Sequence, residues 1–445
     1  LALSLLQVPP SARPKRVFYG WVLVFSAMVN QMIVAGLGGQ GFGAFILPLQ
    51  NEFGWAKSTL SVARSLTQVE SGLLNPLEGT LVDRLGPRIM VVAGMTVFGS
   101  GLVLLGFVHS LWMYYMAFIV IALGSSLAGM VVMSTAINNW FRHRLTMALS
   151  ISQTGQGFGG IILVPLLVWA IVVLGWREAA IAAGIFSWSV GIPMGLLMRH
   201  KPEQYGMRPD GDPEAVPSTA QELKPETKAR PAPAQGRVNF TLGEAMRTPA
   251  FWLIGMGHGF SVMVVGAVTT HQFAHMEMSD GVGLSSASAT LVVTVLNIVT
   301  VSGRFSVGLI GDRLDKRYIA AIGNLMGSAA LAMFALAHSV GLAMGYAVLF
   351  GISWGIRGPL MSSIRSDYFG RTHFGKIIGT SQLIATFLAI IAPVFAGFMA
   401  DWQGNYRLAF IILAFISALG AVSFLLVKPP KPPQRASQDA TIHPA

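Results

Sequence analysis

The chain has 445 residues, of which 53% are hydrophobic and 11% are charged, and its formal net charge is +11. A soluble domain carries about 25% charged residues, so this composition excludes an ordinary soluble domain and points to a membrane protein. The basic residues lie in short clusters between apolar stretches with few aromatic residues beside them, which argues against nucleic-acid binding. The absence of cysteine excludes disulfides, thiolate metal sites and a thiol nucleophile.

Apolar stretches follow one another along the whole chain, and each is long enough to cross a hydrocarbon core of ~30 Å. The first continues well beyond the length of a signal peptide without a small-residue cleavage site, so we interpret it as a membrane span. The sequence therefore predicts an all-α membrane protein with twelve transmembrane helices. The predicted spans are 18–47, 59–82, 89–108, 112–137, 146–173, 179–198, 249–275, 285–309, 318–338, 341–364, 376–400 and 407–427.

The segment 199–248 interrupts this pattern, because it is rich in Pro, Glu, Lys and Ala and has no apolar helical stripe. Such a composition indicates a flexible linker, which divides the spans into two bundles of six. The predicted domains are an N-terminal segment 1–17, an N-terminal bundle 18–198, the linker 199–248, a C-terminal bundle 249–427 and a tail 428–445.

Lysine and arginine collect on one side of the predicted bundles, together with both termini and the linker. The opposite side has only Lys57, Arg177 and Arg407, whereas the first side includes Arg313 and Arg365. Positive residues stay in the cytoplasm, so we predict a multi-pass protein of the cell inner (cytoplasmic) membrane with both termini and the linker in the cytoplasm.

One phrase occurs twice, as GTLVDRLGPR at 79–88 and as GLIGDRLDKR at 308–317, and Asp312 follows Asp83 by 229 residues. NNWFRHR at 138–144 and SDYFGRTHFGK at 366–376 keep nearly the same offset. A duplicated half predicts two bundles related by a pseudo-two-fold axis, with a site at their interface.

The repeated phrase resembles the conserved loops of the major facilitator superfamily. FYGWVLV at 18–24, GWR at 175–177 and PEQYGMRPDGD at 202–212 are similar to its monocarboxylate porter and oxalate–formate antiporter branch. The resemblance implies that the repeated loop closes the two bundles together in the outward-facing state. A plain positive-inside turn is the alternative. The predicted gating residues are Gly79, Asp83, Arg84, Arg88, Asp312 and Arg313.

Charged side chains within a span cost roughly 2.5–3.5 kcal/mol on insertion scales, so they indicate function. Arg304 lies eight residues before Asp312, and Arg357 lies eight before Arg365, which we take as the cytoplasmic end of its span. Both are then about 12 Å inward, at 1.5 Å per residue. Two guanidiniums at this depth favour an anion, since each can hold a carboxylate bidentately, and the resemblance supports Arg304 as a substrate ligand. Structural ion pairs, above all with Glu70, are the alternative.

Glu70 shares the second span with Arg64 and could either carry a coupling proton or neutralise an arginine. The monocarboxylate porters have an aspartate at the position of Thr300 and a lysine at that of Gln40, and the oxalate branch has a lysine in the eleventh span. This chain lacks all three, so proton symport and anion exchange both remain open, with Arg357 as the second positive charge.

The internal repeat aligns His271 with Gln40, so we expect both to face one cavity from opposite bundles. His271 could sense or shuttle a proton or simply lie at the membrane surface, where we also place His275, while the role of His258 stays open. The predicted substrate-binding residues are Arg304, Arg357, His271, Gln40, Asn297 and Gln382, with Glu70 and His271 as proton-coupling or charge-balancing residues.

The glycines of SQTGQGFGG at 152–160 lack the context of a phosphate-binding loop and predict close helix packing.

We find no catalytic constellation, metal ligands or cofactor site. We therefore predict a secondary active transporter, not an enzyme, that moves a small organic anion (a mono- or dicarboxylate) by alternating access. We expect it to be a monomer in the lipid bilayer, with protons as a possible partner. A drug-like or neutral-solute exporter of the same superfamily and a non-transporting membrane sensor are the alternatives.

Overall fold

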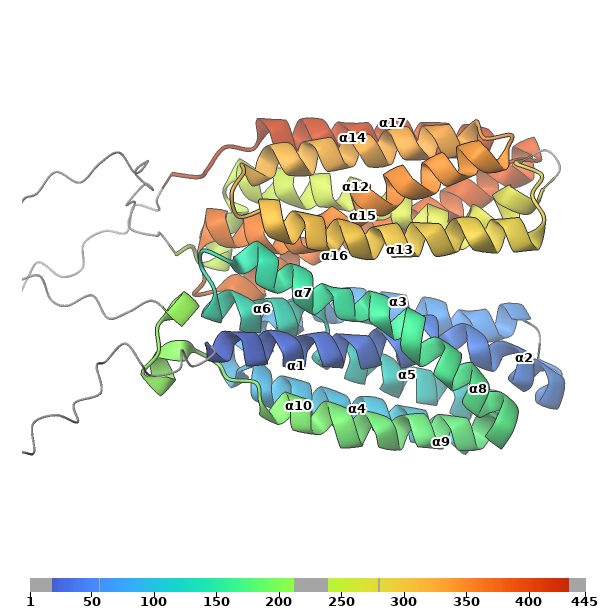
Figure 1. Ribbon diagram of the computed structural model, residues 1–445, viewed down its shortest axis with the longest axis horizontal. Helices are drawn as coiled ribbons and strands as arrows, with labels where there is room; N and C mark the ends of the chain where they lie inside the picture. The colour runs from blue at the N-terminus through green and yellow to red at the C-terminus, as the bar shows by residue number, and fades with distance from the viewer. Residues whose placement is uncertain (1–17, 56, 212–238, 279–280, 432–445) are drawn as a thin grey trace, which may run out of the picture.

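The computed structural model describes residues 18–55, 57–211, 239–278 and 281–431, and over these residues the regular structure is helical. The predicted N-terminal segment 1–17, and most of the predicted linker and tail, lie outside the described residues. Long helices run side by side along the longest axis of the molecule and form two bundles (Figure 1).

The N-terminal bundle contains the blue to green helices of Figure 1. Its apolar interior is continuous and includes Phe98, Tyr114 and Trp140, each at most 1% exposed. Its helices are α1 (Tyr19–Ile33), η2 (Val34–Gln40), α2 (Phe42–Phe53), α3 (Lys57–Leu85), α4 (Pro87–Gly106), α5 (Leu111–Leu127), α6 (Met130–Trp140), α7 (Leu145–Phe158), η3 (Gly159–Leu163), α8 (Val164–Leu174), α9 (Trp176–Phe186), η4 (Ser187–Gly191) and α10 (Ile192–Leu196).

The C-terminal bundle contains the yellow to red helices. Two apolar clusters fill its interior, one around Phe334 and Tyr346 and the other around Phe251 and Leu360. Its helices are α12 (Pro249–Glu277), α13 (Ser286–Ile310), α14 (Lys316–Ala335), α15 (Val340–Phe369), α16 (Phe374–Gln403) and α17 (Arg407–Leu426).

The predicted spans agree with these helices to within a few residues at most ends. Eleven helical stretches of the described chain are long and apolar enough to cross a membrane. The remaining predicted span is α3, which has 29 residues but is too polar for that group because it includes Arg64, Glu70, Glu78 and Asp83. Twelve crossings in two bundles result, as predicted.

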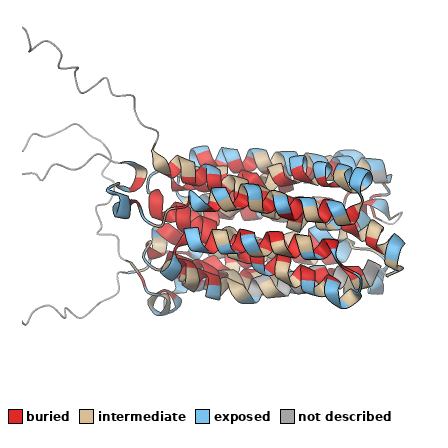
Figure 2. Ribbon diagram, turned by 90° about the horizontal axis from the view of Figure 1, so that it is seen from below, coloured by how far each residue is buried: buried red, intermediate tan, exposed pale blue. Residues whose placement is uncertain are grey.

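Exposed apolar side chains cover the outside of the bundles. On α8, Trp169, Val172 and Val173 are 58–78% exposed, and pale blue segments run along the outer helices in Figure 2. Water would penalise such a surface, whereas lipid chains match it.

The short helices η5 (Pro202–Tyr205), η6 (Pro209–Gly211) and α11 (Leu242–Met246) lie at the end of the molecule where α1 begins (Figure 1). We call this the linker end and the opposite one the far end. The 3₁₀-helices and α11 fall within the predicted linker, so its two flanks are structured.

The glycine-rich segment of α7 packs closely, as predicted. A Cβ at Gly155 would lie 2.1 Å from the Met28 carbonyl oxygen, and one at Gly159 would lie 2.5 Å from that of Met32. Glycine is therefore required where α7 and η3 cross α1 and η2.

Candidate functional site

A cavity of about 250 Å³ lies between the two bundles, and we call it the central cavity. Helices η2, α3, α5 and α6 form one wall, and α12, α15 and α16 form the other. Its lining residues are Val34, Asn75, Glu78, Ser125, Ser126, Gly129, Met130, Val131, His258, Met361, Ser362, Arg365, Ile378 and Gln382.

Interrupted helices shape the wall on the N-terminal side. The fourth span breaks between α5 and α6, where Gly129 has an extended backbone and α6 begins without a side-chain cap. The first span continues as the π-helix η2, a form often found at functional sites. In α3, Pro76 removes one backbone donor next to Asn75. Broken helices are tolerated at membrane depth where they line a cavity.

Arg365 lies in the C-terminal wall and is only 1% exposed. Its Nε donates to Ser381 Oγ (3.0 Å), its Nη1 to the Met361 carbonyl (3.0 Å) and its Nη2 to His258 Nδ1 (3.2 Å). These acceptors are all neutral, and no described carboxylate forms an ion pair with Arg365. The guanidinium is therefore held by neutral hydrogen-bond acceptors and is not in direct contact with a described carboxylate.

Glu78 lies in the opposite wall and is 3% exposed. Its Oε1 is buried and has no hydrogen-bond partner among the described residues. The central cavity thus places one acidic and one basic side chain on opposite bundles.

Sequence reasoning missed Glu78, His258 and Arg365 as a group. Arg365 was assigned to the cytoplasmic surface, and this is wrong, because α15 continues to Phe369 and buries it. A basic residue at the end of an apolar span fits the positive-inside pattern equally well, so the sequence carried no separate signal for its burial.

A second cavity of about 160 Å³ lies within the N-terminal bundle. It adjoins the central cavity, since Val34, Ser125, Gly129 and Met130 line both. Its other lining residues are Gln31, Ala35, Gly38, Gly39, Phe42, Phe118, Ile121, Ala122, Ala128 and Gln156.

Arg304 lies at the contact of α13 with α7 and is 7% exposed. Its Nη1 donates to the Gln153 carbonyl and its Nη2 to Gln156 Oε1, at 2.6 and 3.2 Å. Gln156 Nε2 in turn donates to Gln31 Oε1 at 2.9 Å. Arg304 therefore joins the two bundles here and lines neither cavity, so its predicted role as a substrate ligand stays a prediction.

Arg357 points into the C-terminal bundle. It is 8% exposed, stacks on Trp354 and borders a space of about 10 Å³ between α14 and α15. Of the other predicted ligands, Gln382 lines the central cavity, whereas Asn297 is exposed on α13. The structure does not bring Arg357 and Arg304 together at one site.

His271 and Gln40 do not meet in a described cavity. His271 Nε2 lies 2.9 Å from the Pro393 carbonyl oxygen and its ring packs at a tilt against Tyr406. Gln40 Nε2 donates to the Gln156 carbonyl at 3.0 Å. The prediction that His275 is interfacial is wrong: it is 0% exposed, because α12 turns it into the aromatic core around Phe334.

Glu70 has a buried Oε2 without a hydrogen-bond partner among the described residues. It forms no ion pair there with Arg304 or Arg357, so the alternative that it neutralises one of them is wrong for this conformation. The structure does not describe the side chain of Arg64.

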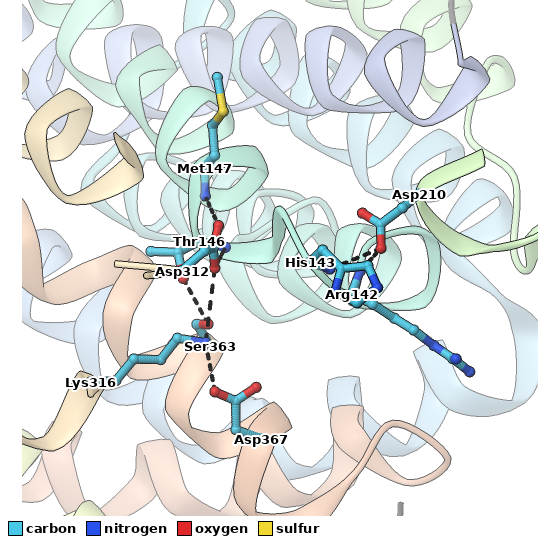
Figure 3. Close-up of polar contacts among 9 residues, drawn as sticks. All are labelled: Arg142, His143, Thr146, Met147, Asp210, Asp312, Lys316, Ser363 and Asp367. Atoms are coloured by element: carbon cyan, nitrogen blue, oxygen red, sulfur yellow. Dashed lines mark hydrogen bonds and ion pairs between the residues drawn. The ribbon is translucent and has the colours of Figure 1, made fainter. Parts of the chain in front are cut away.

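The repeated Asp residues join the bundles in the same way. Asp83, at the end of α3, accepts from the N–H groups of Gly375 and Lys376 at the start of α16, at 3.2 and 3.0 Å. Asp312, after α13, accepts from the N–H groups of Thr146 and Met147 at the start of α7, at 2.9 and 3.2 Å (Figure 3). Each carboxylate meets the positive end of a helix dipole.

Close backbone contact accompanies the first of these joints. A Cβ at Gly79 would lie 2.0 Å from the Gly375 carbonyl oxygen. The remaining predicted gating residues, Arg84, Arg88 and Arg313, are exposed at the linker end.

Other contacts between the bundles also lie nearer the linker end. Thr146 Oγ1 donates to Ser363 Oγ at 2.9 Å, and Ser362 Oγ to Ser134 Oγ at 3.4 Å. With the bonds of Asp83 and Asp312, these contacts gather near the linker end, while the bonds of Arg304 lie deeper between the bundles. The two bundles are therefore joined at the linker end.

Comparison with known proteins agrees with this architecture. Monocarboxylate transporter 13 of Rattus norvegicus is 24% identical over 414 residues, covering 92% of this chain and 89% of that protein. The oxalate:formate antiporter of Oxalobacter formigenes is 22% identical, covering 93% of each. The solved structure of the E. coli fucose:proton symporter covers 93% of this chain and 100% of its own, with a TM-score of 0.68 at 15% identity, which shows a shared fold. A family model for the Major Facilitator Superfamily matches residues 23–281 and 259–444, so the chain belongs to the major facilitator superfamily of membrane transporters.

Proposed function

We propose that this protein is a secondary active transporter of a small organic anion, held at Arg365 in the central cavity. The observation that carries the proposal is the buried guanidinium of Arg365, which lies between the two bundles and contacts neutral acceptors rather than a described carboxylate. A guanidinium binds a carboxylate more strongly than the neutral acceptors that surround it now.

The start of α6 supports the same assignment. Gly129, Met130 and Val131 line the central cavity at the N-terminus of this 11-residue helix. The N–H groups and the dipole of a helix N-terminus favour negative charge. The cavity of about 250 Å³ is also smaller than the ~300–1,000 Å³ of drug-sized sites, which favours a small carboxylate over a drug-like solute.

Alternating access would follow from opening the linker end while the far end closes. The basic residues at the linker end favour a cytoplasmic location for it, with both termini and the linker, in the cell inner membrane. The conformation described is then outward-facing. The names of the relatives, a monocarboxylate transporter and an oxalate:formate antiporter, are consistent with an anionic substrate moved by symport or exchange.

Opening the linker end would also break the bonds of Arg304 to Gln153 and Gln156. In that state Arg304 becomes available as a second ligand for the anion. We keep it as a proposed substrate ligand of the inward-facing conformation.

The test is uptake of radiolabelled formate, oxalate, lactate and benzoate into proteoliposomes. Arg365→Gln removes the charged partner of the carboxylate, worth roughly 1.5–3 kcal/mol per charged hydrogen bond. We therefore expect KM for the transported acid to rise by at least about tenfold. Arg357→Gln, two turns away and also buried but outside the central cavity, should change KM by less than about threefold. An equal effect of both variants, or none from Arg365→Gln, would contradict the proposal.

A further inference from the structure

Glu78 and Arg365 face the same cavity from opposite bundles without forming an ion pair. Both are almost completely buried, at 3% and 1% exposed. Arg365 is held by neutral acceptors, whereas Glu78 Oε1 has no hydrogen-bond partner among the described residues. Ser126 hydrogen-bonds the Glu78 carboxyl, but no described cation forms an ion pair with it. Burying an ionised carboxylate without a paired cation is costly, and taking up a proton removes that cost.

The helices of the N-terminal bundle that pack against α3 offer Glu78 no counter-charge at the cavity. From α5 and α6, the lining residues are Ser125, Ser126, Gly129, Met130 and Val131, and none of them titrates. Helix α4 carries only Arg88, exposed at the linker end, and α2 carries Glu52 near the far end.

The helices of the C-terminal bundle present two titratable groups to the cavity. Helix α16 contributes Ile378 and Gln382, and its Lys376 lies at the linker end, where Asp83 bonds its N–H group. The groups that face Glu78 are therefore His258 on α12 and Arg365 on α15. On α3 itself, Glu70 lies two turns towards the far end and Asp83 lies towards the linker end.

The bond from Arg365 fixes the state of His258. Arginine is a donor only, so the Nδ1 atom that receives this bond carries no proton. This geometry assigns His258 as the neutral tautomer protonated at Nε2. A second proton on His258 would sit on Nδ1 and face the Arg365 N–H group, so two donors would oppose each other. His258 is therefore kept neutral, and Glu78 remains as the lining group that can gain and lose a proton.

We propose that Glu78 carries the proton that is co-transported with the anion, which rests on the proposed function and decides between symport and exchange. With no substrate, ionised Glu78 balances Arg365. When the anion binds Arg365, Glu78 takes a proton from water in the cavity, becomes a neutral carboxylic acid and restores the balance. The proton returns to water on the other side after the bundles rock.

This balance explains why proton and anion move together. A cavity with the anion but no proton would have one surplus negative charge, and a cavity with the proton alone would have one surplus positive charge. Closing either state away from water is costly. Only the empty and the doubly loaded carrier can then cross readily.

The experiment compares two activities of the full-length protein in proteoliposomes, using whichever of radiolabelled formate, oxalate, lactate or benzoate the wild type transports. One is accumulation driven by an inward proton gradient, and the other is exchange of internal for external label without a gradient. Glu78→Gln mimics the protonated residue, so we expect exchange within about threefold of wild type. Gradient-driven accumulation should fall to the equilibrium level.

Glu70→Gln tests the rival carboxylate on the same helix, and gradient-driven accumulation should survive it. Accumulation retained by Glu78→Gln, or lost with Glu70→Gln instead, would overturn the proposal. Loss of both activities in Glu78→Gln would also overturn it, because Glu78 would then be needed for binding or folding. A wild type that exchanges label but ignores the gradient refutes proton coupling alone, whereas one that takes up none of the acids refutes the proposed function.

Discussion

Glu52, near the far end, is held by two side chains at the start of α9. The Trp176 indole donates to Oε2 at 2.6 Å, and Arg177 donates to Oε1 and forms an ion pair. The bond from Arg177, with that from Trp176, holds the pKa of the Glu52 carboxyl below its ordinary value. Glu52 lies beyond the apolar part of the first span, so this contact fastens α2 to α9 at the membrane surface.

The lowered pKa of Glu52 gives its contact a pH dependence with a definite sign. A carboxyl whose pKa is lower in the folded state contributes stability above its unfolded value, about 4.5, and loses it as the pH falls through the folded value. Glu52→Gln should therefore lower Tm in detergent at about pH 7 and have little effect near pH 3. Glu178→Gln, an exposed carboxyl on the same helix as Arg177, is the control. A Glu52→Gln effect of equal size at both pH values would contradict this account.

The buried arginines show which parts of the site could be predicted from the sequence. Spacing from a landmark gives the depth of Arg304 and Arg357, but not the direction in which each side chain points. Arg357 points into its own bundle and Arg304 bonds to α7, because neighbouring helices rather than local sequence decide which face of a helix meets the cavity. Arg365 was missed because a basic residue near the end of a span also fits the positive-inside pattern.

Helices α3 and α16 form the closest crossing between the bundles. A Cβ added at Gly79 or at Gly375 would overlap the backbone of the other residue. A Cβ added at Gly379 would overlap the backbone of Asn75 in the same way. The pseudo-equivalent crossing of α13 with α7 is looser, because a Cβ at Gly308 would meet the Ser150 side chain at 2.9 Å rather than a carbonyl oxygen at 2.0 Å.

This difference predicts unequal effects from the same substitution. Gly79→Ala must push two backbones apart, so we expect closure at the linker end to weaken and initial uptake to fall at least about tenfold. Gly308→Ala should reduce uptake by only about twofold to threefold, since an added methyl group that displaces a side chain costs less than one that displaces a backbone. Measured uptake in proteoliposomes checks both, with expression and Tm as folding controls. Equal losses would show that the two crossings are equally tight.

The element level was the most predictable part of the fold. Apolar length alone predicts the membrane spans, and the 229-residue offset predicts that α3 and α13 are equivalent helices of the two bundles. The break between α5 and α6 was not predictable, because Gly129 stands in an apolar run that reads as one continuous helix. Nor was the π-helix η2, whose extra residue per turn depends on packing against η3.

At the scale of the whole molecule, two carboxylates join the bundles at the linker end. Asp83 and Asp312 lie on opposite bundles, and each bonds the first N–H groups of a helix in the other bundle. Because the two joints have the same geometry, each should contribute similarly to closure.

Replacing either carboxylate should therefore open the linker end to a similar degree. The chain has no cysteine, so Ser363→Cys, at a position 0% exposed between the bundles, gives a single reporter thiol. Asp83→Asn and Asp312→Asn should each speed its reaction with a maleimide roughly tenfold, for a loss of about 1.4 kcal/mol.

Asp315→Asn is the matched control, because Asp315 pairs with Arg317 within the C-terminal bundle at the same end. Asp367 is less suitable, because its partner Lys316 also pairs with Asp312 (Figure 3). Asp315→Asn should leave the labelling rate unchanged. Acceleration by only one of Asp83→Asn and Asp312→Asn would show that closure depends on one joint.

The hydrogen-bond donors in these two joints are main-chain N–H groups, so the residues that supply them need not be conserved for the bonds to form. Any residue except proline supplies an N–H at positions 146, 147 and 376, so side chains there can change while the bond persists, whereas position 375 must stay glycine because of its contact with Gly79. For the bonds themselves, constraint then falls mainly on one partner of each pair, Asp83 or Asp312. Comparing related sequences for co-varying positions would miss both joints, although they fasten the two halves of the molecule.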